Sequence, residues 1–220
     1  MRPLLALAPL VLTLSGVPAP AADWPDGLAA DIVIQASNLS QAGLHGAWTL
    51  AADASSSDGI KLATWSGDCA VTDAGARTAP LATPADYFDV AFAAAAGTPY
   101  RVWLRLKALD DSGDCDFVWV QFSDALVGGR LAYQVGTPSG LLVRLQPCGG
   151  CGNSGWGWQD SSWRLAQPAT VTFATNGVHT LRIQAGVRGV QIDQIVVSPG
   201  RYLTGAPGPS QDDVTSVRRE

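Results

Sequence analysis

The sequence predicts an all-β protein, an antiparallel β-sandwich of about ten strands. Apolar and polar residues alternate with a period of two along most of the chain, and no run of ten residues has the 3.6-residue period of an amphipathic helix. Glycine and proline are frequent, at 24 and 14 of 220 residues, and many of them fall between the alternating runs. Short strands separated by such turn signals are typical of a β-sandwich.

The clearest strand covers residues 100–107, where every second side chain is apolar. Trp103, Arg105 and Lys107 share its other face, which predicts either a concave binding face or a sheet face covered by a loop. Asn176-Gly177 predicts a hairpin turn, and residues 186–189 a second one. The other expected strands are 32–37, 46–52, 60–65, 87–92, 117–122, 141–146, 170–175, 179–184 and 190–197.

The first 21 residues have the features of a secretory signal peptide. Arg2 precedes an apolar run over 4–14, and residues 19–21 form an Ala-Pro-Ala cleavage site. The run is too short for a transmembrane helix. We therefore expect an exported protein, secreted, periplasmic or at the cell surface, with a β-sandwich over 22–198 and a C-terminal tail or linker over 199–220.

Composition excludes several classes of function. The formal net charge is −5, so the basic surface that nucleic-acid binding requires is missing. All acidic side chains except Glu220 are aspartates, and the two histidines, His45 and His179, lie in no catalytic motif. The aspartates of residues 110–116 are clustered, but such a cluster does not distinguish acid/base catalysis from calcium binding or solvation. We therefore expect no enzyme activity. A secreted Asp-based glycan hydrolase is an alternative, ranked second after the one given below.

The four cysteines are expected to form disulfides, because an exported chain folds in an oxidising compartment. Of three possible connectivities, Cys148–Cys151 with Cys69–Cys115 is favoured, since the two cysteines of a C-x-x-C pair are already close in the chain. A four-thiolate zinc site usually has two close pairs, and this chain has one. A redox role for Cys148 and Cys151 is the other alternative, and no βα pattern surrounds them.

Two tryptophans suggest a ligand site. Trp156 and Trp158 stand two apart in a glycine-flanked stretch, so an extended loop would point both rings to one side. Sugars stack their C–H faces on such rings, and polar side chains bind their hydroxyls. We expect Asp160 to accept such bonds, with further contacts from neighbouring loops by Trp65, Asp73, Arg77 and Asn153. The alternative is that the two rings cap the core.

Five blocks of the chain, at 32–37, 85–92, 97–105, 177–184 and 189–197, resemble in their order the conserved blocks of family 6 and family 35 carbohydrate-binding modules. The resemblance covers about 31–198. It implies a galactose-binding-domain-like sandwich of jelly-roll type that binds glycans without catalysis. The sugar sites of these families use loop aromatics, which implies this role for Trp156 and Trp158.

The same resemblance implies a structural calcium between the first and last strands. Asp193 keeps the acid of the last strand, whereas Gln35 and Ser37 stand where the families have glutamate. Because Ca²⁺ needs charge compensation, we expect calcium to bind weakly or not at all. The predicted function is thus a secreted module that recognises an extracellular polysaccharide or glycan through loop tryptophans. The first alternative is a structural or adhesive surface module that binds protein.

Overall fold

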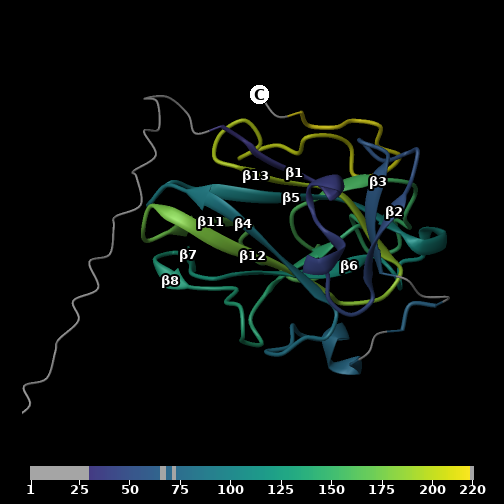
Figure 1. Cartoon of the computed structure of the whole chain (residues 1–220), viewed down its shortest axis with the longest axis horizontal. Helices are drawn as coiled ribbons and strands as arrows, with labels where there is room; N and C mark the ends of the chain where they lie inside the picture. Colours follow the sequence, from purple (N-terminus) through teal and green to yellow (C-terminus); the bar gives the residue numbers. More distant parts are fainter. Residues whose placement is uncertain (1–29, 65–67, 71–72, 219–220) are drawn as a thin grey trace, which may run out of the picture.

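The chain forms two antiparallel β-sheets packed face to face, which confirms the predicted sandwich (Figure 1). The computed structural model describes residues 30–64, 68–70 and 73–218. The expected signal peptide and Trp65 lie outside these residues. Secondary structure in the described residues consists of strands and short 3₁₀ turns, as the period-two pattern predicts.

The larger sheet has nine strands in the order β2-β3-β13-β5-β11-β7-β8, with β1 paired to β13 and β10 to β5. Its strands are β1 (Ile32–Gln35), β2 (Trp48–Ala52), β3 (Ile60–Thr64), β5 (Tyr100–Ala108), β7 (Ala125–Val127), β8 (Arg130–Leu131), β10 (Gly157–Gln159), β11 (Thr170–Phe173) and β13 (Val190–Ser198). The smaller sheet has the order β4-β12-β6-β9, from β4 (Tyr87–Ala94), β6 (Phe117–Phe122), β9 (Leu141–Arg144) and β12 (Gly177–Ala185). The 3₁₀ turns are η1 (Ala36–Asn38), η2 (Gln41–Gly43), η3 (Ala74–Arg77) and η4 (Leu109–Asp111). All ten expected strands are present, and β7, β8 and β10 are short additions.

The main core fills the space between the two sheets. Alternate residues of each strand face inward, for example Leu104 on β5 and Val120 on β6, and both are fully buried. Phe173 of β11 is surrounded by other aromatic rings, with edge contacts to Phe92 and Phe122. Two smaller apolar clusters lie outside this core, one on the outer face of each sheet. These outer clusters matter for the sites below.

Both predicted hairpins are wrong. The strands on either side of Asn176-Gly177 are β11 and β12, and they belong to different sheets. The same holds for β12 and β13, which flank residues 186–189. β11 pairs with β5 and β7, and β12 pairs with β4 and β6, so neither has a free edge for the other. Asn176 instead accepts a hydrogen bond from the backbone N–H of Ala96 at 2.7 Å, and the turn crosses from one sheet to the other.

Both predicted disulfides are present. Cys69 and Cys115 are joined with their Cα atoms 5.0 Å apart, and Cys148 and Cys151 with theirs 5.4 Å apart. The first bond closes a sequence separation of 46 residues. In the chain-entropy model a loop of this length contributes roughly 3–4 kcal/mol of stability.

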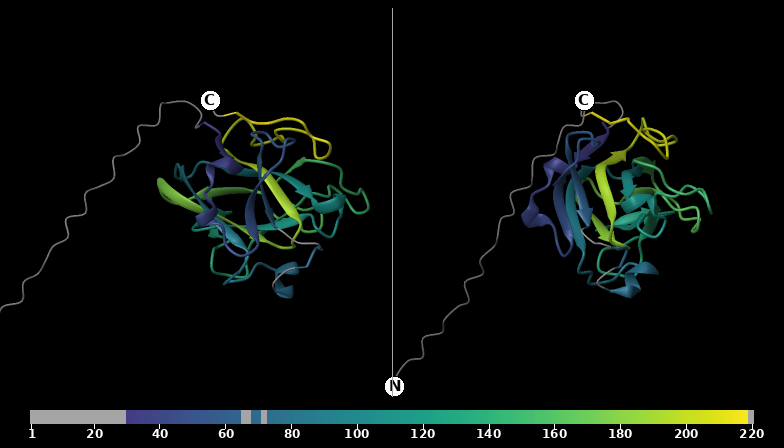
Figure 2. Two further views of the ribbon diagram at one scale, coloured as in Figure 1. Left: turned by 45° about the vertical axis from the view of Figure 1, so that its right-hand side comes forward. Right: turned by 90° about the vertical axis from the view of Figure 1, so that its right-hand side faces the viewer.

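The C-terminal residues 199–218, expected as a tail or linker, are packed against the sandwich. They fold back over the outer face of the larger sheet and remain against the body of the molecule in all views (Figures 1 and 2). Val217 is buried in a cluster with Trp103 and Trp158, and its backbone is hydrogen-bonded to the Gln194 side chain in both directions. The outer face of β5 is therefore covered by chain over much of its length, the second of the two possibilities expected for it.

Candidate functional site

A buried ion network fixes the C-terminal residues to the sheet. Arg105 on β5 points outward and pairs with the carboxylates of Asp193 on β13 and Asp213 in the C-terminal segment. It also donates to the backbone carbonyl of Asp213 at 2.7 Å. Asp193 stands at an irregularity in the register between β13 and β5, a bulge that re-aims its side chain. The three side chains are at most 2% exposed, so each charge depends on its partners.

The residues implied for calcium do not fit a calcium ion. The Asp193 carboxylate accepts hydrogen bonds from the backbone N–H of Ser57 at 3.0 Å and from its hydroxyl at 2.8 Å, in addition to the Arg105 pair. The same hydroxyl oxygen lies 2.8 Å from the Gln35 side-chain oxygen. The guanidinium thus supplies the positive charge beside Asp193. Among the described residues, no group of three or more His, Cys, Asp or Glu side chains is placed to hold a metal ion.

We therefore expect the melting temperature to change by less than about 1 °C on addition of EDTA. A calcium ion present at 100 times its dissociation constant would add about 2.7 kcal/mol, or roughly 5–10 °C for a domain of this size. Differential scanning calorimetry with EDTA and then with excess Ca²⁺ measures this. A large loss on chelation that Ca²⁺ reverses would show that other oxygen atoms build a site.

The predicted tryptophan pair is buried, so it does not form an exposed stacking platform. Trp156 is 3% exposed and Trp158 is 1% exposed. Trp158 lies under the C-terminal segment and donates its indole N–H to Thr215 at 3.3 Å. Asp160 is also buried and forms an ion pair with Arg101. The two rings do share one side of the chain, as expected, but that side is covered.

Trp156 nevertheless forms part of a wall of a large groove, called here the Trp156 groove. The groove has a volume of about 550 Å³ and lies between the loop of residues 54–57 and residues 212–216 of the C-terminal segment. Eight of its twelve lining residues are polar or charged: Ser55, Ser56, Ser57, Arg105, Lys107, Asp212, Asp213 and Ser216, with Ala54, Gly155, Trp156 and Val214. Trp156 donates its indole N–H to the Ser55 hydroxyl at 3.0 Å, which fixes the ring. The Arg105 and Lys107 cations lie over the ring, 5.3 and 5.7 Å from its centroid.

The charges that line this groove balance. Arg105 and Lys107 contribute two positive charges, and Asp212 and Asp213 contribute two negative charges. Arg105 is shared between Asp213 and the buried Asp193 behind the groove, which leaves Lys107 and Asp212 to meet a ligand. Such a groove suits a neutral ligand rich in hydroxyl groups, which both donates and accepts hydrogen bonds.

The other predicted site residues lie away from this groove. Arg77, at the end of η3, lines two adjoining hollows on the outer face of the smaller sheet. Asn153 donates to the buried carboxylate of Asp116 at 3.3 Å, so its amide helps to hold that group. Burial raises the pKa of the Asp116 carboxyl, and Arg144 and Asn153 act in the opposite direction. The structure therefore does not bring Arg77, Asn153 and Trp156 into a single site.

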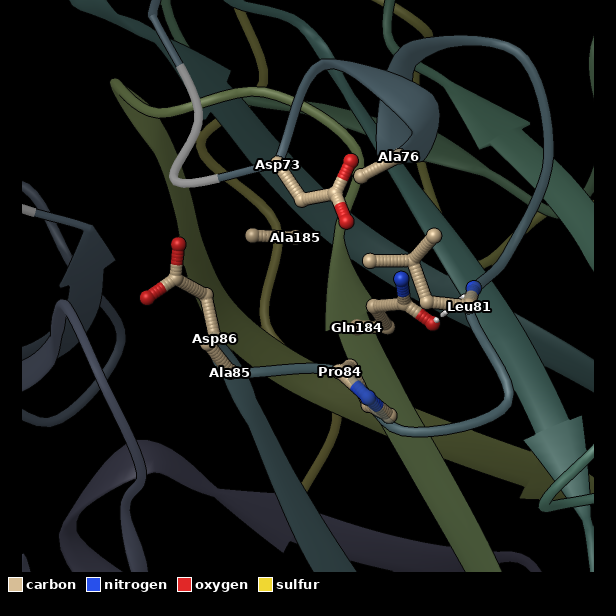
Figure 3. A pocket seen from close by; sticks show the side chains of 8 residues that line it. All are labelled: Asp73, Ala76, Leu81, Pro84, Ala85, Asp86, Gln184 and Ala185. Carbon is tan, nitrogen blue, oxygen red and sulfur yellow. Dashed lines mark hydrogen bonds between the residues drawn. The ribbon is translucent and has the colours of Figure 1, made fainter.

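Asp73 lines a different and much smaller cavity, shown in Figure 3 with Asp86 and Gln184. Its volume of about 10 Å³ is close to the minimum for one water molecule. The Gln184 side-chain oxygen accepts a hydrogen bond from the Leu81 backbone at 3.0 Å, and its buried amide nitrogen has no partner among the described residues. This cavity is too small for a sugar ring.

Sequence reasoning missed one exposed aromatic residue, Trp163, which is 50% exposed. Its ring lies against Gly149 of the Cys148–Cys151 loop, where a β-carbon would come within 3.1 Å of the ring. One face of the indole is thus packed on a disulfide-closed loop. Trp163 stands alone in a polar stretch, without a second aromatic residue two positions away, so the pattern that indicated Trp156 and Trp158 does not detect it.

The chain matches no known family model and no curated protein, but it is similar to several solved structures. One is a mannanase of Podospora anserina with a family 35 carbohydrate-binding module, at 10% identity and a TM-score of 0.45, covering 78% of this chain and 28% of that one. Another is the C-terminal family 6 module of a marine laminarinase from Zobellia galactanivorans, at 9% identity and a TM-score of 0.41, covering 76% and 98%. A third is a family 6 module of a Cellvibrio mixtus lichenase in complex with cellotriose, at 12% identity and a TM-score of 0.40, covering 77% and 98%.

At identities of 9 to 12% the similarity concerns the fold. The chain spans only about a quarter of the mannanase. Among the described residues, no helix is long and apolar enough to cross a membrane.

Proposed function

We propose that this protein is an exported, non-catalytic carbohydrate-binding module, and that the Trp156 groove binds a neutral oligosaccharide. The observation that supports this most is the convergence of serine hydroxyls, an ammonium group and a carboxylate around the Trp156 groove. Its volume of about 550 Å³ lies in the range of about 300–1,000 Å³ typical of small-ligand sites. The two disulfides are consistent with export, because such bonds persist in oxidising compartments.

Hydrolysis is not part of this proposal, because the groove does not offer the two working carboxyl groups of a glycosidase. Asp212 and Asp213 both line it, but the Asp213 carboxylate accepts a hydrogen bond from the Arg105 guanidinium. Asp212 remains to face the ligand, and it also accepts a bond from Ser154 at 2.6 Å. An adhesive module whose partner is a protein remains the alternative that the experiment below separates.

Replacing Lys107 with alanine or Asp212 with asparagine is expected to weaken neutral-glycan binding roughly ten- to a hundredfold. Each change removes a charged hydrogen-bonding group, which is worth about 1.5–3 kcal/mol in a desolvated contact. Neither side chain is fully buried, so folding should be retained. Isothermal titration calorimetry with an oligosaccharide found by a glycan screen gives the affinities.

Arg130→Ala is the matched control, because this exposed residue on β8 carries the same charge as Lys107 and does not line the groove. The affinity of the Arg130→Ala variant for the oligosaccharide should stay within twofold of the wild type. If folded wild-type protein binds no oligosaccharide, or if both groove variants bind as well as Arg130→Ala, the assignment of the Trp156 groove is wrong.

A further inference from the structure

A second groove lies on the outer face of the smaller sheet and is rich in arginine. It consists of two adjoining hollows of about 310 and 120 Å³ that share Arg77, Leu142 and Arg164. We call it the arginine groove. Its other lining residues are Thr78, Asp114, Phe117, Trp119, Arg144 and Leu165. It is on the opposite sheet from the Trp156 groove, so the two grooves are separate.

The arginine groove carries a net positive charge. Arg144 pairs with the buried Asp116 at 3.0 Å, so its charge is compensated. Asp114 is the one carboxylate among the described residues that line the groove. Neither Arg77 nor Arg164 forms an ion pair with any described residue. One positive charge therefore exceeds the local negative charge, in a chain whose formal net charge is −5.

Two hydrogen bonds hold the Arg77 side of the groove in place. Trp119 donates its indole N–H to the carbonyl of Ala76 at 2.7 Å, which ties η3, and with it Arg77, to β6. Arg77 itself donates to the carbonyl of Cys69 at 2.9 Å, beside the long-range disulfide. Its remaining guanidinium N–H groups are available to a ligand.

The loop that carries Arg164 is also held. Gln167 accepts a hydrogen bond from the backbone N–H of Leu142 at 2.9 Å and donates to the carbonyl of Gly140 at 2.9 Å. Leu165, 41% exposed, contributes an apolar surface beside the guanidinium groups of Arg77 and Arg164. A planar guanidinium binds carboxylate or sulfate with two parallel hydrogen bonds, and an apolar wall accommodates the C–H face of a sugar ring.

We propose that the arginine groove binds an acidic polysaccharide, one whose sugar rings carry carboxylate or sulfate groups. The negative charge of the whole protein opposes non-specific attraction of a polyanion, so binding has to come from this local cluster. The proposal is independent of the Trp156 groove, which is balanced in charge and faces away from this sheet.

The test measures binding of polygalacturonate and of its fully methyl-esterified form, which has the same backbone without charge. Dextran sulfate and dextran form the second pair, and they distinguish sulfate from carboxylate as the preferred group. We expect at least one charged polymer to bind and its neutral counterpart to bind at least tenfold more weakly. Arg77→Gln and Arg164→Gln should each weaken binding about tenfold or more, since each removes a charged hydrogen-bonding group.

Arg130→Gln is the matched control, because it removes the same charge from an exposed site on β8 outside the groove. It should change the affinity less than twofold. The proposal is overturned if neither charged polymer binds the folded protein, or if Arg130→Gln weakens binding as much as the two groove variants. Neutral oligosaccharides are titrated separately, so failure here leaves the Trp156 groove to its own test.

Discussion

Replacing Arg105 with alanine is expected to lower the free energy of unfolding by about 3–5 kcal/mol, because it leaves two buried carboxylates without their cation. Asp193 and Asp213 are both 0% exposed in their side chains. For a domain of this size the loss corresponds to roughly 10 °C in melting temperature. The C-terminal segment should also become sensitive to protease, since Asp213 connects it to β5. Chemical denaturation followed by circular dichroism, with limited proteolysis, measures both effects.

Arg182→Ala is the matched control, because its pair with Asp89 lies at the surface, with 40% of the Asp89 side chain exposed. Exposed pairs contribute about 0–1 kcal/mol, so this variant should stay close to the wild type. Equal losses for Arg105→Ala and Arg182→Ala would mean that the buried network does not hold the C-terminal segment in place.

Trp158→Ala is expected to cost about 3–5 kcal/mol of stability, the usual range for truncating a buried tryptophan. The ring is 1% exposed and packs with Val33, Trp103, Val196 and Val217 beneath the C-terminal segment. The substitution would leave a cavity between the larger sheet and the C-terminal residues that cover it. Thermal and chemical unfolding of the variant give the value.

Trp163→Ala serves as the comparison, because the same substitution is made where the side chain is half-exposed. It should cost about 1 kcal/mol or less, in line with the smaller area removed from contact. If Trp158→Ala were as stable as Trp163→Ala, then Trp158 would not be part of a packed interior, and an exposed platform at 156–158 would again be possible.

The strands follow from the sequence because their signal is local. In β5 the alternation of apolar residues with Arg101, Arg105 and Lys107 places Leu104 inward, and the structure agrees. β6 is apolar on both faces apart from Gln121, and Val120 faces the core. The disulfides follow from the expected export of the chain and from the short Cys148–Cys151 spacing. The strand pairing across the two predicted turns could not be predicted. A turn signal such as Asn176-Gly177 indicates that the chain reverses, but it does not specify which strands pair on either side of the turn.

The position of the C-terminal segment could not be predicted, because its contacts are distant in sequence. Asp213 meets Arg105 across 108 positions, and Trp158 meets Thr215 across 57. Such contacts involve isolated residues of the segment, so they leave no periodic pattern in residues 199–218. The same holds for the arginine groove, where three separate loops and strands bring Arg77, Arg144 and Arg164 together. The sequence predicts Arg77 as a ligand residue in the same site as Trp156 and Trp158, whereas the structure places it on the outer face of the other sheet.

The most direct test of the proposed glycan site is a titration of the disulfide-bonded protein with the best neutral oligosaccharide from a glycan screen, monitored by tryptophan fluorescence. Trp156 forms part of the wall of the proposed site, so a bound sugar should change its emission. We predict a saturable change, with an affinity that Lys107→Ala weakens at least tenfold and Arg130→Ala leaves within twofold of the wild type. Absence of binding to every neutral glycan, or equal affinity in both variants, would contradict it.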